Sequence, residues 1–139
     1  MPFDLSVVTP EGEAFDGPAE TVVLPGTEGD FGVLPGHEPF LTGLRIGTMT
    51  IRTAGGEEMH AAVSRGFAEV LGDSVSVMVG SCDFAHDIDR EAAEVARERA
   101  RRQLEELRGT AEGEELYQQY QEEYSRAIAR IAVTDRFKT

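Results

Sequence analysis

The run Leu24-Pro-Gly-Thr-Glu-Gly-Asp-Phe-Gly-Val-Leu-Pro-Gly-His-Glu-Pro-Phe-Leu41 decides the fold of this chain. It holds four glycines, three prolines and three acidic residues around a short apolar segment. Glycine reaches backbone conformations with positive φ, while proline fixes φ and lacks an amide proton, so this mixture is incompatible with a helix. The pattern predicts two tight turns around a short apolar run, in a region of defined loop shape that is suited to carry function.

On both sides of this run, residues 3–84 show the signals of short strands separated by glycine-rich turns. Apolar residues alternate with polar ones around Leu5, Ile51 and Val77, which is typical of half-buried strands. Turns are expected at Asp16-Gly-Pro18 and at Ala54-Gly-Gly56. Many short strands at this spacing predict a β-sandwich or a barrel, and no helical period occurs before residue 87.

The hydrophobic period changes to that of a helix at Asp87-Ile-Asp89. Either aspartate can cap the helix, and an apolar stripe built mostly of alanine follows at three- and four-residue steps, namely Ala93, Ala96, Ala100, Leu104 and Leu107. Residues 108–113 break this helix, and a second one follows with three tyrosines and Ile131 on one face. Small residues facing large ones predict a close antiparallel hairpin, whose alanine stripe gives it little apolar area for docking.

The length of 139 residues allows one core with an appendage or two small domains, and we expect domains at 1–86 and 87–139. The net charge of −13 is concentrated in residues 1–88, with 14 acidic and only 3 basic side chains, which argues against nucleic-acid binding. No apolar run approaches the ~20 residues of a membrane span, and the first residues lack a signal-peptide pattern. The single cysteine, Cys82, excludes an intrachain disulfide, and we expect a cytoplasmic chain.

The run Gly29-Asp-Phe-Gly-Val-Leu-Pro-Gly-His-Glu-Pro-Phe-Leu41 resembles the signature loop of the ε subunit of bacterial F-type ATP synthase. The segments Leu44-Arg-Ile-Gly47 and Ser64-Arg-Gly-Phe-Ala-Glu-Val70 also fit that family, and the resemblance extends over nearly the whole chain. It implies a β-sandwich of two antiparallel sheets followed by an α-helical hairpin. It also implies a rotor subunit that couples proton translocation to ATP synthesis and inhibits ATP hydrolysis through its C-terminal helices.

The resemblance implies partners as well: the γ subunit, the c-ring of Fo, and the catalytic α/β head when the hairpin is extended. The chain would then lie at the cytoplasmic face of the bacterial membrane, attached only through the complex. The candidate residues for contact with the c-ring or γ are Glu28, Asp30, His37 and Glu38. Glycine and proline in this loop alternatively serve only to shape the turns.

Four arginines of the first helix fall within about 20° of one line at ~100° per residue, namely Arg90, Arg97, Arg101 and Arg108. In the extended form that the resemblance implies, this row would meet acidic residues of the catalytic head, because guanidinium groups match carboxylates. The alternative is a solvated face with local ion pairs, Glu94 with Arg97 and Glu105 with Arg108.

Some members of this family bind ATP on the hairpin through an (I/L)-D-x-x-R-A motif and arginines of the second helix. Ile88 and Asp89 match the start of that motif, and Arg126 and Arg130 lie one turn apart, but Ala92 occupies the arginine position. We therefore expect no cofactor. No metal-ligand spacing, nucleophile elbow or paired carboxylates are present, which predicts a subunit without catalytic activity. The alternative is a free-standing β-sandwich ligand-binding module that dimerises through its hairpin.

Overall fold

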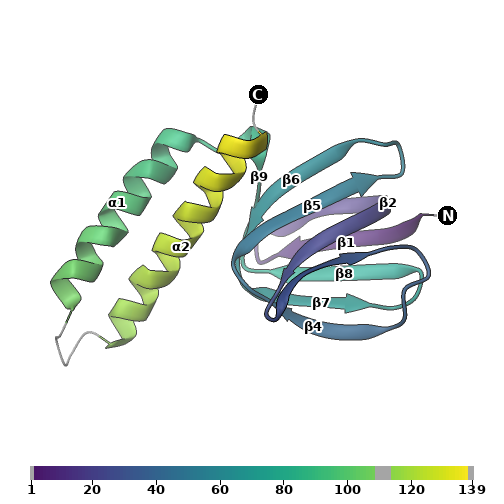
Figure 1. Cartoon of the computed structure of the whole chain (residues 1–139), viewed down its shortest axis with the longest axis horizontal. Helices are drawn as coiled ribbons and strands as arrows, with labels where there is room; N and C mark the ends of the chain where they lie inside the picture. Colours follow the sequence, from purple (N-terminus) through teal and green to yellow (C-terminus); the bar gives the residue numbers. More distant parts are fainter. Residues whose placement is uncertain (1, 109–113, 138–139) are drawn as a thin grey trace.

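The structure is a computed structural model that describes residues 2–108 and 114–137. It contains nine strands and a short 3₁₀ helix, η1, followed by two α-helices. The strands are β1 (Phe3–Thr9), β2 (Gly12–Gly26), β3 (Gly29–Val33), β4 (Phe40–Leu44), β5 (Gly47–Thr53), β6 (Glu58–Val63), β7 (Gly66–Val70), β8 (Ser74–Val79) and β9 (Cys82–Phe84). The helical segments are η1 (Ala85–Asp87), α1 (Arg90–Leu107) and α2 (Glu114–Phe137). The expected β-sandwich followed by a helical hairpin is confirmed (Figure 1).

One long strand, β2, joins the two layers of the sandwich. Its first half pairs with β1, and its second half pairs with β5 on one side and β3 on the other, with a register shift between Ala19 and Thr21. The turn that the sequence predicted at Asp16-Gly-Pro18 is therefore wrong, because these residues continue the strand. Pro18 is tolerated there since β2 exchanges β1 for β5 immediately after it, and its carbonyl accepts a hydrogen bond from Ala54 N at 3.1 Å.

The pairing of the strands is antiparallel with one exception among the described residues. β1 pairs in parallel with β8, with Leu5 opposite Val75 and Val7 opposite Val77. The order β1-β8-β7-β4-β2 closes on itself through the β1–β2 pair, and β5, β6 and β9 continue from β2. The sandwich is thus held together by backbone hydrogen bonds at its edge as well as by its core.

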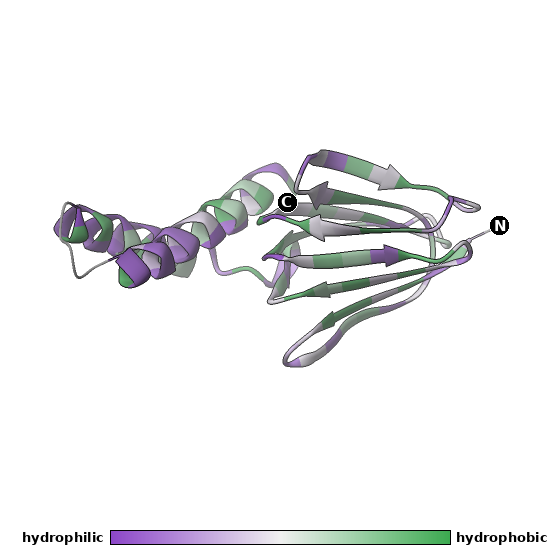
Figure 2. Cartoon of the chain, turned by 90° about the horizontal axis from the view of Figure 1, so that it is seen from below, coloured by the Kyte–Doolittle hydropathy of each residue, from purple (hydrophilic) through white to green (hydrophobic). Residues whose placement is uncertain are grey.

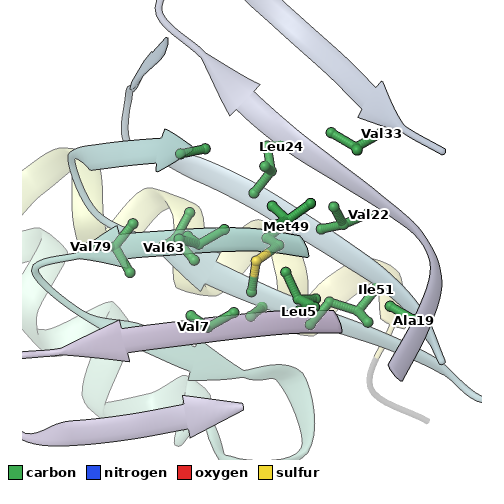
Figure 3. Close-up of a cluster of buried hydrophobic side chains, with 14 of the residues drawn as sticks. Leu5, Val7, Ala19, Val22, Leu24, Val33, Met49, Ile51, Val63 and Val79 are labelled. Atoms are coloured by element: carbon green, nitrogen blue, oxygen red, sulfur yellow. The ribbon is translucent and has the colours of Figure 1, made fainter. Parts of the chain in front are cut away.

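Alternating apolar side chains from both layers form one core between the sheets. Leu5, Val22, Leu24, Met49 and Ile51 are fully buried and face one another (Figure 3). Each such side chain contributes roughly 1.5–3 kcal/mol relative to exposure. This core is complete without the helices, which contribute none of its buried members.

The two turns predicted around β3 are confirmed. Gly29 follows the β2–β3 turn with φ +133°, a value that side chains disfavour. At the other end, Pro35 and Gly36 occupy the centre of a turn that His37 N closes on Leu34 O at 3.3 Å, with Gly36 at φ +80°. Proline followed by a left-handed glycine is the pattern of a type II turn.

The helical hairpin packs beside one end of the sandwich and projects away from it (Figures 1 and 2). Asp89 caps α1, since its carboxylate accepts a hydrogen bond from Ala92 N at 3.1 Å. Ala93 and Ala100 of the predicted stripe are buried, and α2 buries Ala127 and Ile131. The break between the helices was expected at residues 108–113, of which 109–113 lie outside the described residues.

Candidate interaction surfaces

The four candidate contact residues of the signature loop separate into two groups. Glu28 lies in the β2–β3 turn, and Asp30 pairs with Arg45 at the same end of the sandwich. His37 and Glu38 lie in the β3–β4 loop at the other end of β3, where the His37 ring packs against Phe40 at 5.1 Å between centroids. All four side chains are exposed. Because the two groups lie at opposite ends of β3, a single flat contact surface does not include both.

The pairing of the strands also shows which group lies near the helices. Gly26 is opposite Leu44, and Leu44 is opposite Gly66, so the β2–β3 turn lies at the end of the sandwich where Arg65 contacts α2. The β3–β4 loop lies at the opposite end, beyond the strand partners Phe40 and Val70. Sequence proximity suggested one contact surface, and the tertiary structure divides it.

The arginine row of α1 is divided by its local partners. Arg90 forms a two-point ion pair with Asp135 of α2, with Nε–Oδ1 at 2.7 Å and Nη2–Oδ2 at 3.1 Å, and also pairs with Glu94. These hydrogen bonds raise the pKa of the guanidinium above its ordinary value. Arg101 is bound by Glu98 at 2.7 Å and by Glu105 at 3.2 Å.

The other two arginines of the row have a different environment. Arg97 is half-buried and Arg108 is exposed, and within residues 2–108 and 114–137 neither forms an ion pair. The expected local pairs, Glu94 with Arg97 and Glu105 with Arg108, are therefore wrong. Each glutamate instead pairs with the arginine four residues before it.

Three of the four residues predicted for the possible nucleotide site, Ile88, Asp89 and Arg130, come together around α1 and α2. A cavity of about 190 Å³ is lined by Ile88, Asp89, Ala92, Ala93 and Arg130, together with Asp83 and Asp87. Arg130 donates from Nε to Asp83 Oδ2 at 3.0 Å, so its charge is already partnered. Three aspartates and one paired arginine make this cavity unfavourable for a triphosphate.

Arg126 faces a second, larger cavity. That cavity, of about 380 Å³, lies between α2 and the β1–β2 turn and is also lined by Glu11, Glu13 and Arg130. The Nε atom of Arg126 is buried and has no hydrogen-bond partner in the described part of the chain. The two arginines thus line one cavity, but Glu11 and Glu13 line it as well.

A small apolar cluster docks the hairpin on the sandwich. Ala62 of β6, Ala85 of η1 and Ile88 are buried with Ala129 and Val133 of α2, and Ile46 and Phe137 pack at its edge. Two ion pairs surround the cluster, Arg130 with Asp83 and Arg65 with Glu122, the second at 2.9 Å. Sequence reasoning did not identify Asp83, Arg65 or Glu122, because no local pattern indicates contacts between such distant segments.

The exposed face of the sandwich carries an apolar row across three neighbouring strands. Val8 of β1 is opposite Met78 of β8, which is opposite Phe67 of β7, and these side chains are 40%, 49% and 56% exposed. Leu41 of β4 lies two residues before Gly43, the partner of Phe67, and is 66% exposed. A contiguous apolar row of this kind is typical of a protein contact surface.

The described part of the chain offers neither a cluster of metal ligands nor a reactive thiol. No group of three or more His, Cys, Asp or Glu side chains in it could hold a metal ion. Burial raises the pKa of the Cys82 thiol to about 12, which keeps it protonated and unreactive at neutral pH. Within residues 2–108 and 114–137, neither helix is long and apolar enough to cross a membrane.

The fold and these surfaces define a class of protein: a β-sandwich followed by a two-helix hairpin, with an apolar row on an exposed face of the sheet. The family models named ATP synthase, Delta/Epsilon chain, match the chain twice, with the beta-sandwich domain at residues 2–85 and the long alpha-helix domain at residues 86–135. The chain belongs to this family of ATP synthase ε chains.

Curated relatives agree with this assignment. The chain is 48% identical over 101 residues to the ATP synthase epsilon chain of Desulfosudis oleivorans, covering 73% of this chain and 76% of that one. It is 38% identical to the ATP synthase epsilon chain of Prochlorococcus marinus, over 96% of this chain and 99% of the relative. A solved structure of Euglena gracilis mitochondrial ATP synthase, OSCP/F1/c-ring, matches with TM-score 0.78 at 22% identity, over 94% of this chain and 80% of that chain, which supports the fold.

Proposed function

We propose that this chain is a rotor subunit of a proton-translocating F-type ATP synthase and couples proton flow to ATP synthesis without catalysing a reaction itself. Membership of the ε-chain family supports this proposal. Two solved structures with a similar fold come from the OSCP/F1/c-ring assembly of Euglena gracilis mitochondrial ATP synthase and from the central stalk/c-ring of the Tetrahymena thermophila enzyme. The chain would then reside at the cytoplasmic face of the membrane, held there by its partners.

The exposed row of Val8, Met78 and Phe67 is the observation that carries the proposal. These side chains lie on three hydrogen-bonded strands of a rigid sheet, so they present a fixed apolar surface to a partner. We assign this surface to the γ subunit. Phe67→Ser and Met78→Ser together should abolish co-purification with γ and leave the melting temperature of the isolated chain nearly unchanged, because neither residue is in the core.

Val8→Ser at the edge of the row should weaken the same association less, which makes it a graded control. If the double variant still co-purifies with γ at wild-type yield, γ contacts another face. If the wild-type chain forms a stable dimer and does not bind γ, the rotor function is wrong, and the alternative of a free-standing ligand-binding module replaces it.

The two groups of loop residues are alternative contacts with the c-ring. Glu28 and Asp30 lie at the helical end, and His37 and Glu38 lie at the opposite end. Only one end can face the ring in a given orientation of the sandwich. Single-cysteine variants at Glu28 and at His37 should therefore differ in disulfide cross-linking to a cysteine in the c subunit. One variant forms the cross-linked product and the other does not.

The hairpin is proposed to regulate ATP hydrolysis by leaving the sandwich and entering the α/β head. Arg97 and Arg108 are the members of the row that are available, since Arg90 and Arg101 are held by carboxylates of the chain. Arg97→Gln with Arg108→Gln should increase ATP hydrolysis by the assembled enzyme. Arg99→Gln is the matched control, because Arg99 lies about 180° from Arg90 on the helix. Equal hydrolysis by both variants would exclude the arginine row from inhibition.

We also propose that no nucleotide cofactor binds the hairpin. The support is the composition of the cavity of Ile88, Asp89 and Arg130, where carboxylates outnumber guanidinium groups and Ala92 supplies no charge. Isothermal titration of ATP into the full chain should give no heat of binding at micromolar ATP. A saturable signal would contradict this.

A further inference from the structure

An aromatic stack joins the end of the hairpin to the sandwich. The imidazole of His60, on β6, lies against the ring of Phe137, the last residue of α2, with 3.5 Å between centroids and 4° between planes. Arg136 places its guanidinium 5.0 Å from the Phe137 centroid. This contact is separate from the cavities of the possible nucleotide site, and it lies beside the small apolar docking cluster.

The His60 ring is enclosed on its other sides as well. Its Nδ1 is 3.0 Å from the Thr50 hydroxyl of β5, and its Nε2 is 3.3 Å from Glu58 Oε1, so only 13% of the side chain is exposed. Two cations flank the site: Arg136 from α2, and Arg52 from β5, which already pairs with Glu58 at 3.2 Å. The charged groups around the ring among the described residues are thus Glu58, whose carboxylate also pairs with Arg52, and Arg136.

We propose that the His60–Phe137 stack is a proton-sensitive latch: neutral His60 holds the end of α2 on the sandwich, and protonation of His60 releases it. An imidazolium in this position would be poorly hydrated, because the Phe137 ring covers one of its faces. It would also lie near the positive charge of Arg136. Release of α2 would restore that hydration. The latch rests on the proposed regulatory role of the hairpin and adds a signal that releases it. It is tested on the chain alone, independently of any inhibitory contact with the catalytic head.

The direction of the pH dependence follows from the docked environment. Burial lowers the pKa of His60 below its ordinary value of 6.5, and Arg136 lowers it further, while Glu58 acts in the opposite direction. A group whose pKa is lowered on docking contributes stability that is complete above its undocked pKa. That stability decreases as the pH falls below about 6.5, by at most about tenfold in the docking equilibrium per pH unit for one proton.

The test measures both sides of this linkage in the full chain. An NMR titration of the His60 imidazole should give a pKa below the ordinary value in the wild type and a higher one in Phe137→Leu, which removes the stack. Spin labels at Ala54→Cys and Gln119→Cys, with Cys82 replaced by alanine, should show a longer-distance population that grows between pH 7.5 and pH 5.

Two variants distinguish the latch from general acid sensitivity. His60→Phe keeps an aromatic stack but cannot be protonated, so its label distances should not change with pH. His86→Gln removes an exposed histidine and should behave as the wild type. The proposal is overturned if His60 titrates identically with and without Phe137, if wild-type distances do not change with pH, or if His60→Phe still opens at pH 5.

Discussion

Val133 is the most direct point at which to test how weakly the hairpin is docked. Its side chain is fully buried in the small cluster with Ala62, Ile88 and Ala129, and it is absent from the core between the sheets. Val133→Ala removes two carbon groups, each worth about 0.8 kcal/mol when buried, or about 1.6 kcal/mol in total. Since 1.4 kcal/mol corresponds to a factor of ten, the docking equilibrium should fall about 15-fold.

The label pair at Ala54 and Gln119 measures this change as a growing long-distance population at pH 7.5. Val95→Ala is the matched control, because it removes the same atoms from a side chain of α1 that is 67% exposed. The sandwich core should keep its stability, so the main thermal transition of Val133→Ala should stay close to that of the wild type. Identical distance distributions for Val133→Ala and Val95→Ala would refute the idea that this cluster holds the hairpin.

Three further predictions concern the cavity, the sheet and the boundary between the two parts. Ala92→Arg should create measurable ATP binding by calorimetry, because it supplies the missing cation of the motif; no gain would show that the carboxylates alone exclude ATP. Gly66→Ala should lower the free energy of unfolding by about 1–3 kcal/mol in urea, since its Cβ would lie 1.8 Å from Met78 O, whereas Gly55→Ala, with its nearest atom at 3.8 Å, should be neutral. A chain ending after Phe84 should fold cooperatively and still bind γ, as β9 completes the sheet and the core contains no helical residue; loss of cooperative melting would make the hairpin part of the folding unit.

Much of the fold could be predicted from local patterns. Alternation around Leu5, Ile51 and Val77 indicated the strands that supply the core, and the change of period at Asp89 placed the start of α1. These predictions succeed because burial on one face imposes a period on neighbouring residues. The turn expected at Pro18 was wrong since proline is also accepted where a strand exchanges partners, which no local pattern distinguishes from a turn.

The candidate sites were less accessible to sequence reasoning. Helical spacing placed Arg90 and Arg97 on one line, but only the tertiary structure showed that Asp135 of α2 binds Arg90. Likewise, His37 and Glu28 are close in sequence, yet β3 carries them to opposite ends of the sandwich. Ion pairs of this kind depend on the docking of elements, and their partners carry no shared motif.

The sequence by itself determined the two-part architecture, the loop around Gly29 and Gly36, and the family, because turn chemistry, hydrophobic period and motif are local properties. The tertiary structure alone decided the parallel pairing of β1 with β8, the apolar row on the exposed face, and the stack of His60 on Phe137. These contacts join residues far apart in the chain. Their free energy appears only when packing has brought both partners together and removed the water between them.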